Sequence, residues 1–208
     1  MSDRPTIECK PNGPYLVRNL EYLRGSTGDR LETRPDMALC RCGGSANKPF
    51  CDGTHRKNGF SGARLADGSA DKRESYPAKG ITIHDNRSVC AHAGRCTDGL
   101  ASVFKVKSEP WIDAEGGTVE QIIETIHRCP SGALSYTLDG AAGGADPQRQ
   151  PSITVSKDGP YEVTGGVGLP EAAWAQGAST EHYTLCRCGG SRNKPFCDGT
   201  HWSIGFKD

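Results

Sequence analysis

One stretch of 17 residues occurs twice in this chain, 146 positions apart. Residues 39–55 read LCRCGGSANKPFCDGTH and residues 185–201 read LCRCGGSRNKPFCDGTH, so 16 of the 17 positions are identical. Only Ala46 and Arg192 differ. Near-identical segments at a fixed offset are the signature of an internal repeat, so the chain is expected to contain two copies of one small structural unit.

The sequence before each copy keeps the same spacing. Gly13-Pro14-Tyr15 aligns with Gly159-Pro160-Tyr161 without a gap, which extends the repeat to a unit of about 55 residues. Alternating, β-branched-rich sequence at Tyr15–Arg18 and Ile153–Ser156 predicts strands, and Asn12-Gly13-Pro14 predicts a turn. We therefore expect two small β-rich units.

Something other than apolar burial must hold such units together. Only 35% of the residues are hydrophobic, and the chain contains 27 Gly and 13 Pro. The ten cysteines are the alternative source of stability. The opening sequence MSDRPTIECK has neither a signal-peptide core nor the composition of a transit peptide, so we expect a cytoplasmic protein, in which spaced cysteines bind metals more often than they form disulfides.

Charge and hydropathy exclude two classes of partner. The 25 basic side chains balance the 25 acidic ones, which gives no electrostatic reason to expect nucleic-acid binding. No apolar run approaches the roughly 20 residues that a membrane-spanning helix requires. We expect neither nucleic acid nor a membrane as a partner.

The unique segment between the repeats mixes strands with a helix. Gly80–His84 and Ala133–Leu138 predict strands. Thr118–His127 predicts an amphipathic helix that begins at an N-capping Thr118 and has Gln121 three residues later. Its apolar positions are Val119, Ile122, Ile123 and Ile126.

Two stretches have the composition of linkers, namely 67–74 and the Gly/Ala/Pro-rich 140–151. We therefore predict three domains, at residues 1–70, 71–146 and 147–208. The expected fold class is α+β.

Each repeat gathers three cysteines and one histidine in a short span. These residues are Cys40, Cys42, Cys51 and His55, and then Cys186, Cys188, Cys197 and His201. By ligand type alone, such a set suits zinc and an iron-sulfur cluster equally well. Only Arg41 or Arg187 separates the first two cysteines, whereas zinc sites usually have two or more residues there. The spacing favours a cluster and leaves a structural zinc site as the alternative.

The complete string, from Cys-x-Cys to Cys-Asp-Gly-Thr-His, resembles the signature of the CDGSH iron-sulfur (NEET) family. Thr54 and Thr200 replace the Ser of that signature. The resemblance implies a 2Fe-2S cluster in each repeat, and because single-repeat members form two-fold dimers, it also implies an intramolecular pseudo-dimer. The inner iron would be held by Cys40 and Cys42, or by Cys186 and Cys188, and the outer iron by Cys51 and His55, or by Cys197 and His201.

A mixed ligand set has chemical consequences. Replacing a thiolate by neutral imidazole raises the reduction potential of a cluster, and the imidazole also titrates. Asp52 and Asp198 are expected either to cap the Gly-Thr-His turns or to lie in plain solvated Asp-Gly turns. Lys48 and Lys194 are expected to be ordinary exposed lysines.

Three cysteines of the unique segment suggest a further centre. Cys90 and Cys96 occupy the first and third places of a bacterial ferredoxin run, Ala93 stands in the second, and Cys129 precedes a proline. This segment resembles the divergent mono-cluster ferredoxin domain of bacteria. Three thiolates predict a 3Fe-4S cluster, and the alternative is a 4Fe-4S cluster whose fourth iron binds His92 or solvent.

The sequence thus predicts a bacterial electron-transfer protein with three iron-sulfur centres, and no enzyme, because it contains no dinucleotide fingerprint, phosphate loop or catalytic triad. The alternatives are an iron-sulfur cluster carrier or redox and pH sensor, and a zinc-stabilised adaptor. Expected partners are redox proteins or apo iron-sulfur acceptors, and the chain is expected to be a monomer with internal pseudo-two-fold symmetry. The tenth cysteine, Cys9, has no counterpart in the second repeat and is expected to be a small buried apolar residue.

Overall fold

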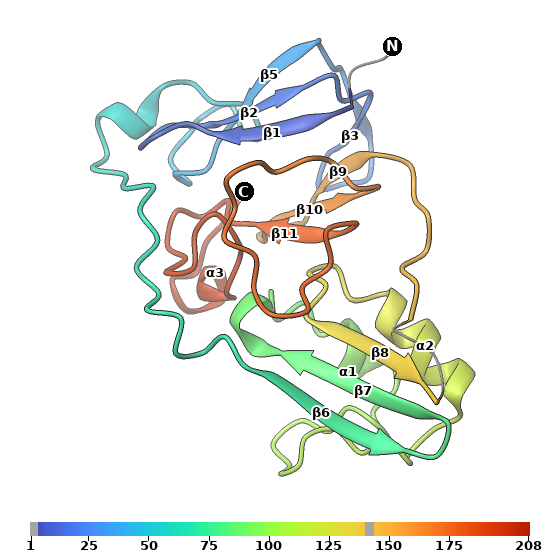
Figure 1. Ribbon diagram of the computed structural model, residues 1–208. Coiled ribbons are helices and arrows are strands. Elements are labelled where there is room, and N and C mark those ends of the chain that lie inside the picture. Colours follow the sequence, from blue (N-terminus) through green and yellow to red (C-terminus); the bar gives the residue numbers. More distant parts are fainter. Residues whose placement is uncertain (1–3, 140–143) are drawn as a thin grey trace.

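Three sheets lie one after another in the computed structural model, which describes residues 4–139 and 144–208 (Figure 1). The first repeat forms one end, the unique segment forms the other, and the second repeat lies between them. Residues 1–3 of the first predicted domain and residues 140–143 of the second predicted linker are outside the described part. Among the described residues, no helix combines the length and apolarity needed to cross a membrane.

Both repeats build the same antiparallel sheet. In the first repeat the strand order is β1-β2-β5, and in the second it is β9-β10-β11. The bounds are β1 Thr6–Cys9, β2 Tyr15–Arg18, β5 Asp36–Leu39, β9 Ser152–Val155, β10 Tyr161–Thr164 and β11 Tyr183–Leu185. Alternate residues of each central strand point inward, so that Tyr15, Val17, Tyr161 and Val163 are buried. The predicted strands at these positions are confirmed.

A parallel strand pair joins the two repeats. In the first repeat, β3 (Tyr22–Arg24) and β4 (Arg30–Leu31) form a hairpin, and β3 pairs with β9 of the second repeat. Tyr22 lies opposite Ser152 in this pair, and the bridge between Gly168 and Thr6 is the same contact with the repeats exchanged. The sheet β11-β10-β9-β3-β4 is therefore shared by both ends of the chain.

The unique segment has a sheet of its own, in the order β6-β7-β8. Its strands are β6 Arg73–Ala78, β7 Ile81–Asn86 and β8 Leu134–Leu138. The helices are the 3-10 turn η2 Arg87–Val89, α1 Arg95–Gly99 and α2 Val119–His127. The predicted strands are confirmed by β7 and β8.

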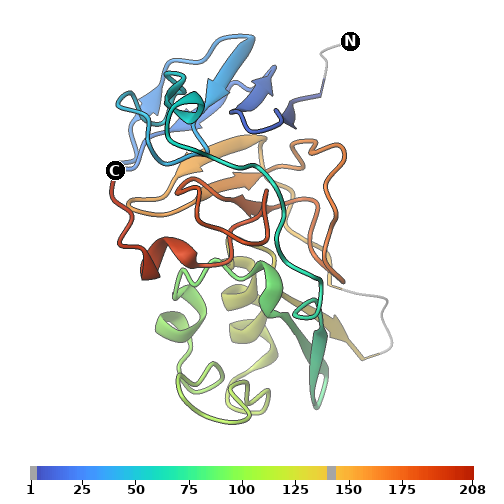
Figure 2. The same ribbon diagram turned by 90° about the vertical axis from the view of Figure 1, so that its left-hand side faces the viewer.

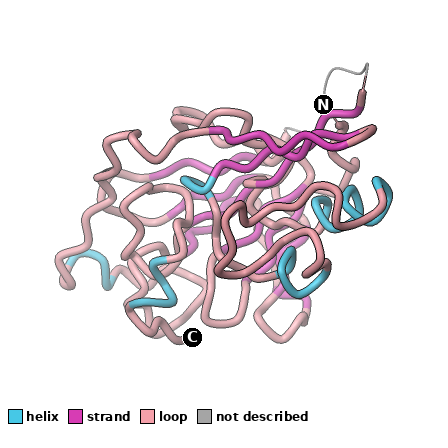
Figure 3. The backbone as a smooth tube through the Cα atoms, turned by 90° about the horizontal axis from the view of Figure 1, so that it is seen from below, coloured by secondary structure: helices cyan, strands magenta, loops and turns pink. Residues whose placement is uncertain are grey.

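The predicted helix is confirmed by α2, with the expected start. The Thr118 side chain accepts from the Gln121 backbone N–H, and the Gln121 side chain accepts from the Thr118 N–H, which completes a capping box. Ile122 and Ile126 are buried on one face. Strands form the interior and helices lie at the periphery (Figure 3).

The linker between the first repeat and the unique segment runs along the second repeat (Figure 2). The backbone N–H groups of Leu65 and Ala66 donate to the Arg192 carbonyl at 2.8 and 2.9 Å. On the other side of the molecule, the Asp146 and Glu181 carboxylates lie 3.5 and 3.1 Å from Nδ1 of buried His182. Both linkers are therefore fixed to the second repeat.

Candidate metal centres

The four predicted ligands of each repeat fall into two close pairs. The Sγ atoms of Cys40 and Cys42 are 3.7 Å apart, and Cys51 Sγ lies 3.4 Å from His55 Nδ1. In the second repeat, the corresponding distances are 3.9 Å for Cys186 and Cys188 and 3.4 Å for Cys197 and His201. Two ligands of one tetrahedral metal with metal–sulfur bonds of about 2.3 Å lie about 3.8 Å apart, so each pair matches one metal atom.

The two pairs of a repeat stay apart from each other. Across the described ranges, the set of three or more potential ligand atoms that lie within 4.8 Å of one another consists of Asp146, Glu181 and His182. Neither repeat therefore draws three of its ligand atoms within that distance, as a single tetrahedral ion requires. This donor set fits a group with two metal atoms.

The ligand loops are held by their own backbone and by one carboxylate each. Asp52 Oδ2 accepts from the Ala46 N–H at 2.8 Å, and Oδ1 accepts from the Thr54 N–H at 3.0 Å. Hydrogen bonds from Thr54 and Ala46 hold the pKa of Asp52 well below its usual range. Asp198 makes the same bonds, to Arg192 and Thr200. The predicted capping role of both aspartates is confirmed.

Each repeat also holds the ligand loop of the other. The Tyr15 hydroxyl donates to the carbonyl of Cys186 at 2.9 Å and of Pro195 at 3.1 Å. The Tyr161 hydroxyl donates to the carbonyl of Cys40 at 2.7 Å and of Pro49 at 3.0 Å. Sequence reasoning missed this role of the tyrosines, although their equivalent positions in the two repeats were a signal that pointed to it.

The arginine inside each Cys-x-Cys motif was also missed. Arg41 and Arg187 are buried, and their Nε atoms donate to the carbonyls of Gly13 and Gly159, each at 2.7 Å. Arg187 also pairs with Asp208. These bonds tie the ligand loop to the turn that precedes the central strand.

Three expectations about single residues need correction. Lys48 is half-buried rather than exposed, and its ammonium lies 6.0 Å from the centre of the Phe206 ring of the second repeat. Lys194 is buried rather than exposed, because its ammonium donates to the Ser191 carbonyl at 2.5 Å and lies 6.0 Å from the centre of the Phe60 ring of the first repeat. Cys9 is half-buried rather than buried, because it lies on β1 at the edge of its sheet. The environments of the lysines could not be predicted without the packing of one repeat on the other.

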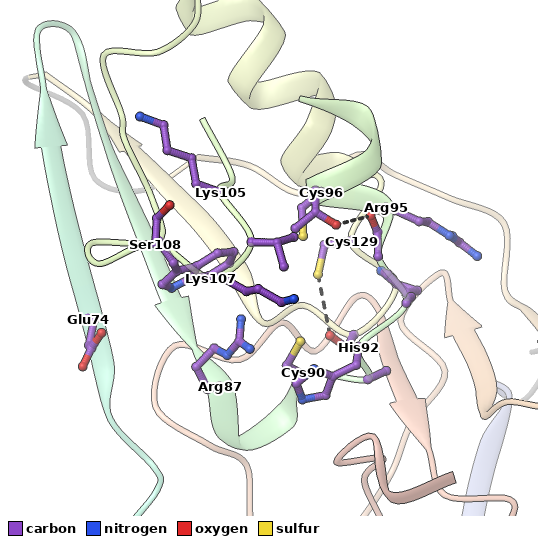
Figure 4. A pocket seen from close by; sticks show the side chains of 18 of the residues that line it. Glu74, Arg87, Cys90, His92, Arg95, Cys96, Lys105, Lys107, Ser108 and Cys129 are labelled. Atoms are coloured by element: carbon purple, nitrogen blue, oxygen red, sulfur yellow. Dashed lines mark hydrogen bonds between the residues drawn. The ribbon is translucent and has the colours of Figure 1, made fainter. Parts of the chain in front are cut away.

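The three cysteines of the unique segment face one pocket (Figure 4). Cys90 follows η2, Cys96 lies in α1, and Cys129 follows α2, so three separate elements bring the thiols together. The cavity has a volume of about 740 Å³. Burial raises the pKa of the Cys90 thiol to about 11. A metal that binds here must therefore displace a tightly held proton.

Basic side chains surround this pocket. Arg87 lies 4.7 Å from the centre of the Trp111 ring, and Lys107 is exposed at the rim. Their positive charge suits a group that carries several thiolates. The ring of His92 lies beside Cys90 in Figure 4. The backbone of His92 has a positive φ of 53°.

Residues 12–56 and 158–202 match the family described as an iron-binding zinc finger of CDGSH type. The chain belongs to the CDGSH iron-sulfur family. Between its two CDGSH segments, residues 76–139 match the family described as a divergent 4Fe-4S mono-cluster. The arrangement expected from the resemblance is confirmed, and the protein is an iron-sulfur protein.

Relatives of this CDGSH protein include Uncharacterized protein YjdI from Escherichia coli strain K12 and its counterpart from Escherichia coli O157:H7. Each is 36% identical over 61 residues, which cover 29% of this chain and 80% of the relative. No solved structure matches the chain.

Proposed function

We propose that this CDGSH protein transfers electrons, with one 2Fe-2S cluster in each repeat and a 3Fe-4S cluster in the unique segment. The observation that carries the proposal is the division of each Cys3His set into two pairs with ligand distances of 3.4 to 3.9 Å. Such clusters take up and release single electrons. The protein supplies thiolate and imidazole ligands, and it holds the ligand loops by hydrogen bonds from Asp52, Asp198 and the two buried arginines.

The reciprocal contacts between the repeats support an intramolecular pseudo-dimer. Tyr15 and Tyr161 exchange hydrogen bonds with the opposite ligand loops, and the contacts Tyr22–Ser152 and Gly168–Thr6 exchange in the same way. In this proposal the chain is a monomer that needs no second copy to complete its sheets.

The unique segment is proposed to be a ferredoxin-like α+β domain with three thiolate ligands. The absence of a cysteine at Ala93 leaves one corner of a four-iron cluster without a thiolate, which favours three irons. The alternative remains a 4Fe-4S cluster with His92 or solvent on the fourth iron.

Iron and sulfide analysis together with electron paramagnetic resonance tests this assignment. Protein purified without air is expected to contain seven iron atoms per chain if the middle cluster has three irons and eight if it has four. Colourless protein that contains zinc would overturn the proposal. If a chelator removes the iron readily and the clusters cannot be reduced reversibly, the cluster-carrier function would be favoured instead.

A further inference from the structure

The two CDGSH loops have nearly the same sequence but different surroundings. Gly53 and Gly199 are equivalent, with φ angles of 88° and 82°. A methyl group on Gly53 would have no atom within 4 Å, whereas one on Gly199 would lie 2.3 Å from His92 Cδ2. The unique segment therefore contacts the ligand loop of the second repeat at a point that the first repeat leaves open.

The ligands themselves reflect this difference. Cys51 and His55 are half-buried, whereas Cys197 and His201 are 3% and 5% exposed. Since the residues in both loops are the same, the cause is the cover that other parts of the chain provide. Figure 1 shows the reason at the level of the fold, because the second repeat lies between the first repeat and the unique segment.

Several polar contacts fix the unique segment to the second repeat, and two of them involve α1 and η2. Arg95 at the start of α1 pairs with Glu162 of β10 at 2.5 Å. The Asn193 side chain donates to the Ser88 carbonyl at 2.8 Å. The residue equivalent to Glu162 is Leu16, which has no carboxylate. The residue equivalent to Asn193 is Asn47, which is exposed.

The surface equivalent to this interface is open in the first repeat. A cavity there is lined by Leu16, Cys51, Gly53, His55 and Phe60, among others. The outer ligand pair of the first repeat therefore borders a cavity at the surface. His201 of the second repeat also borders a cavity, but Ala91, Ala93 and Arg95 of the unique segment form part of its lining. Its volume is about 330 Å³, against about 1060 Å³ for the cavity of the first repeat.

His92 connects the middle cysteines with the second repeat. It lies two residues after Cys90, and its ring packs on Gly199, which lies two residues from both Cys197 and His201. The loops that carry the two groups of ligands are therefore in contact at His92 and Gly199.

We propose that the two CDGSH centres have different roles: the second exchanges electrons with the middle centre across the contact between His92 and Gly199, and the first exchanges with molecules in solution. This inference rests on the proposed function. One electron leaves the group held by Cys90, Cys96 and Cys129, which is oxidised, and enters the group held by the second repeat, which is reduced. A one-electron donor protein at the open middle pocket replaces the electron.

Magnetic relaxation tests whether the middle and second centres are neighbours. The variant Cys40→Ser/Cys42→Ser retains the second CDGSH centre, and the variant Cys186→Ser/Cys188→Ser retains the first. After reduction with dithionite, the 2Fe-2S signal of Cys40→Ser/Cys42→Ser is expected to saturate at higher microwave power than that of Cys186→Ser/Cys188→Ser. The reason is that the paramagnetic middle centre lies near the second CDGSH centre and speeds its relaxation. Adding Cys129→Ser should remove the difference. Faster relaxation of the first centre would overturn the proposal.

Thiol alkylation tests the difference in access without any cluster. In apo-protein treated with iodoacetamide, Cys51 is expected to react about tenfold faster than Cys197, which corresponds to ~1.4 kcal/mol of local opening at the covered site. Peptide mass spectrometry measures both rates in one sample. Equal rates would overturn the proposed difference between the two sites.

A matched pair of variants separates the His92 contact from backbone strain. Gly199→Ala and Gly53→Ala impose the same left-handed strain, but only the first displaces His92. Gly199→Ala should raise the alkylation rate of Cys197 and weaken the relaxation effect, and Gly53→Ala should leave both unchanged. If either variant fails to fold, His92→Asn removes the ring while tolerating a positive φ and should have the same effects as Gly199→Ala. Unchanged rates and relaxation in both Gly199→Ala and His92→Asn would refute a role for the contact.

Failure of this inference differs from failure of the proposed function. Colourless protein without iron would refute the electron-transfer proposal, and with it the exchange of electrons between the centres. Protein with all three clusters and equal access to both CDGSH sites would refute the inference alone.

Discussion

The rings of Tyr15 and Tyr161 cross edge-to-face, with centres 6.0 Å apart and an interplanar angle of 83°. Both side chains are buried, and each belongs to the central strand of its own repeat. The two rings therefore form the centre of the contact between the repeats. From this position each hydroxyl reaches the ligand loop of the opposite repeat.

Tyr15→Phe and Tyr161→Phe are expected to destabilise the protein by similar amounts. Each removes a buried hydroxyl that serves two carbonyls, at a cost of about 1–3 kcal/mol. Urea unfolding followed by circular dichroism measures the change. Tyr22→Phe is the control, because Tyr22 of β3 is only half-buried, and it should change the free energy of unfolding little. Unchanged free energies of unfolding in both Tyr15→Phe and Tyr161→Phe would contradict the prediction.

His55→Cys and His201→Cys are each expected to lower the potential of one 2Fe-2S cluster by on the order of 100 mV or more, because a neutral ligand becomes a thiolate. The potential should also lose its pH dependence, since the titrating ring is gone. Redox titration at several pH values measures both effects. An unchanged pH dependence of cluster loss in the double variant would show that the histidines are not ligands.

Ala93→Cys is expected to convert the middle site towards 4Fe-4S, because it restores the second cysteine of the ferredoxin run. Wild-type protein isolated in air should show the paramagnetic signal of an oxidised 3Fe-4S cluster before any reductant is added. His92→Ala distinguishes the alternative, because it should lower the iron count only if the imidazole binds a fourth iron. Eight irons and no signal in the oxidised wild type would refute the three-iron assignment.

The stability of the protein is expected to depend on pH because of the buried carboxyl of Asp85. This residue is 2% exposed, and burial raises the pKa of its carboxyl from 3.8 to about 6. The folded state therefore binds the proton more tightly than the unfolded state, and stability falls as the pH rises from about 4 to about 6. Asp85→Asn should be more stable than wild type at pH 7 by up to about 3 kcal/mol, and the two proteins should be equal near pH 4.

Thermal unfolding at both pH values measures this effect. Asp113→Asn is a control of opposite sign, because hydrogen bonding to Lys105 lowers the pKa of Asp113. That variant should be less stable than wild type at pH 7. A gain in stability for Asp85→Asn that persists at pH 4 would contradict the titration of Asp85 as its cause.

Local features were predictable because local sequence determines them. The capping box of α2, the alternation along β2 and β9, and the Asp52 turn each depend on residues close together in the chain. The ligand pairs were accessible for the same reason, since each pair spans only a few residues.

The surroundings of the ligands could not be predicted, because they depend on contacts between distant segments. Identical sequence predicts identical local structure and says nothing about which copy another domain covers. Lys194 shows the limit, because its burial depends on packing against the first repeat. The parallel pairing of β3 with β9 could likewise not be predicted, because no periodic pattern in the sequence indicates which strands pair.

The shared sheet also sets the order in which parts of the molecule can fold during synthesis. The first ligand loop is complete at residue 55, yet the carbonyl of Cys40 receives its hydrogen bond from Tyr161, and β3 pairs with residues 152–154. The strands of the unique segment pair over shorter separations, so loop-closure entropy favours their formation first. On a ribosome, the first loop must therefore wait for almost the whole chain to emerge before its native surroundings exist. During that interval its cysteines lack the hydrogen bond from Tyr161 and the β3–β9 pairing that surround them in the folded protein.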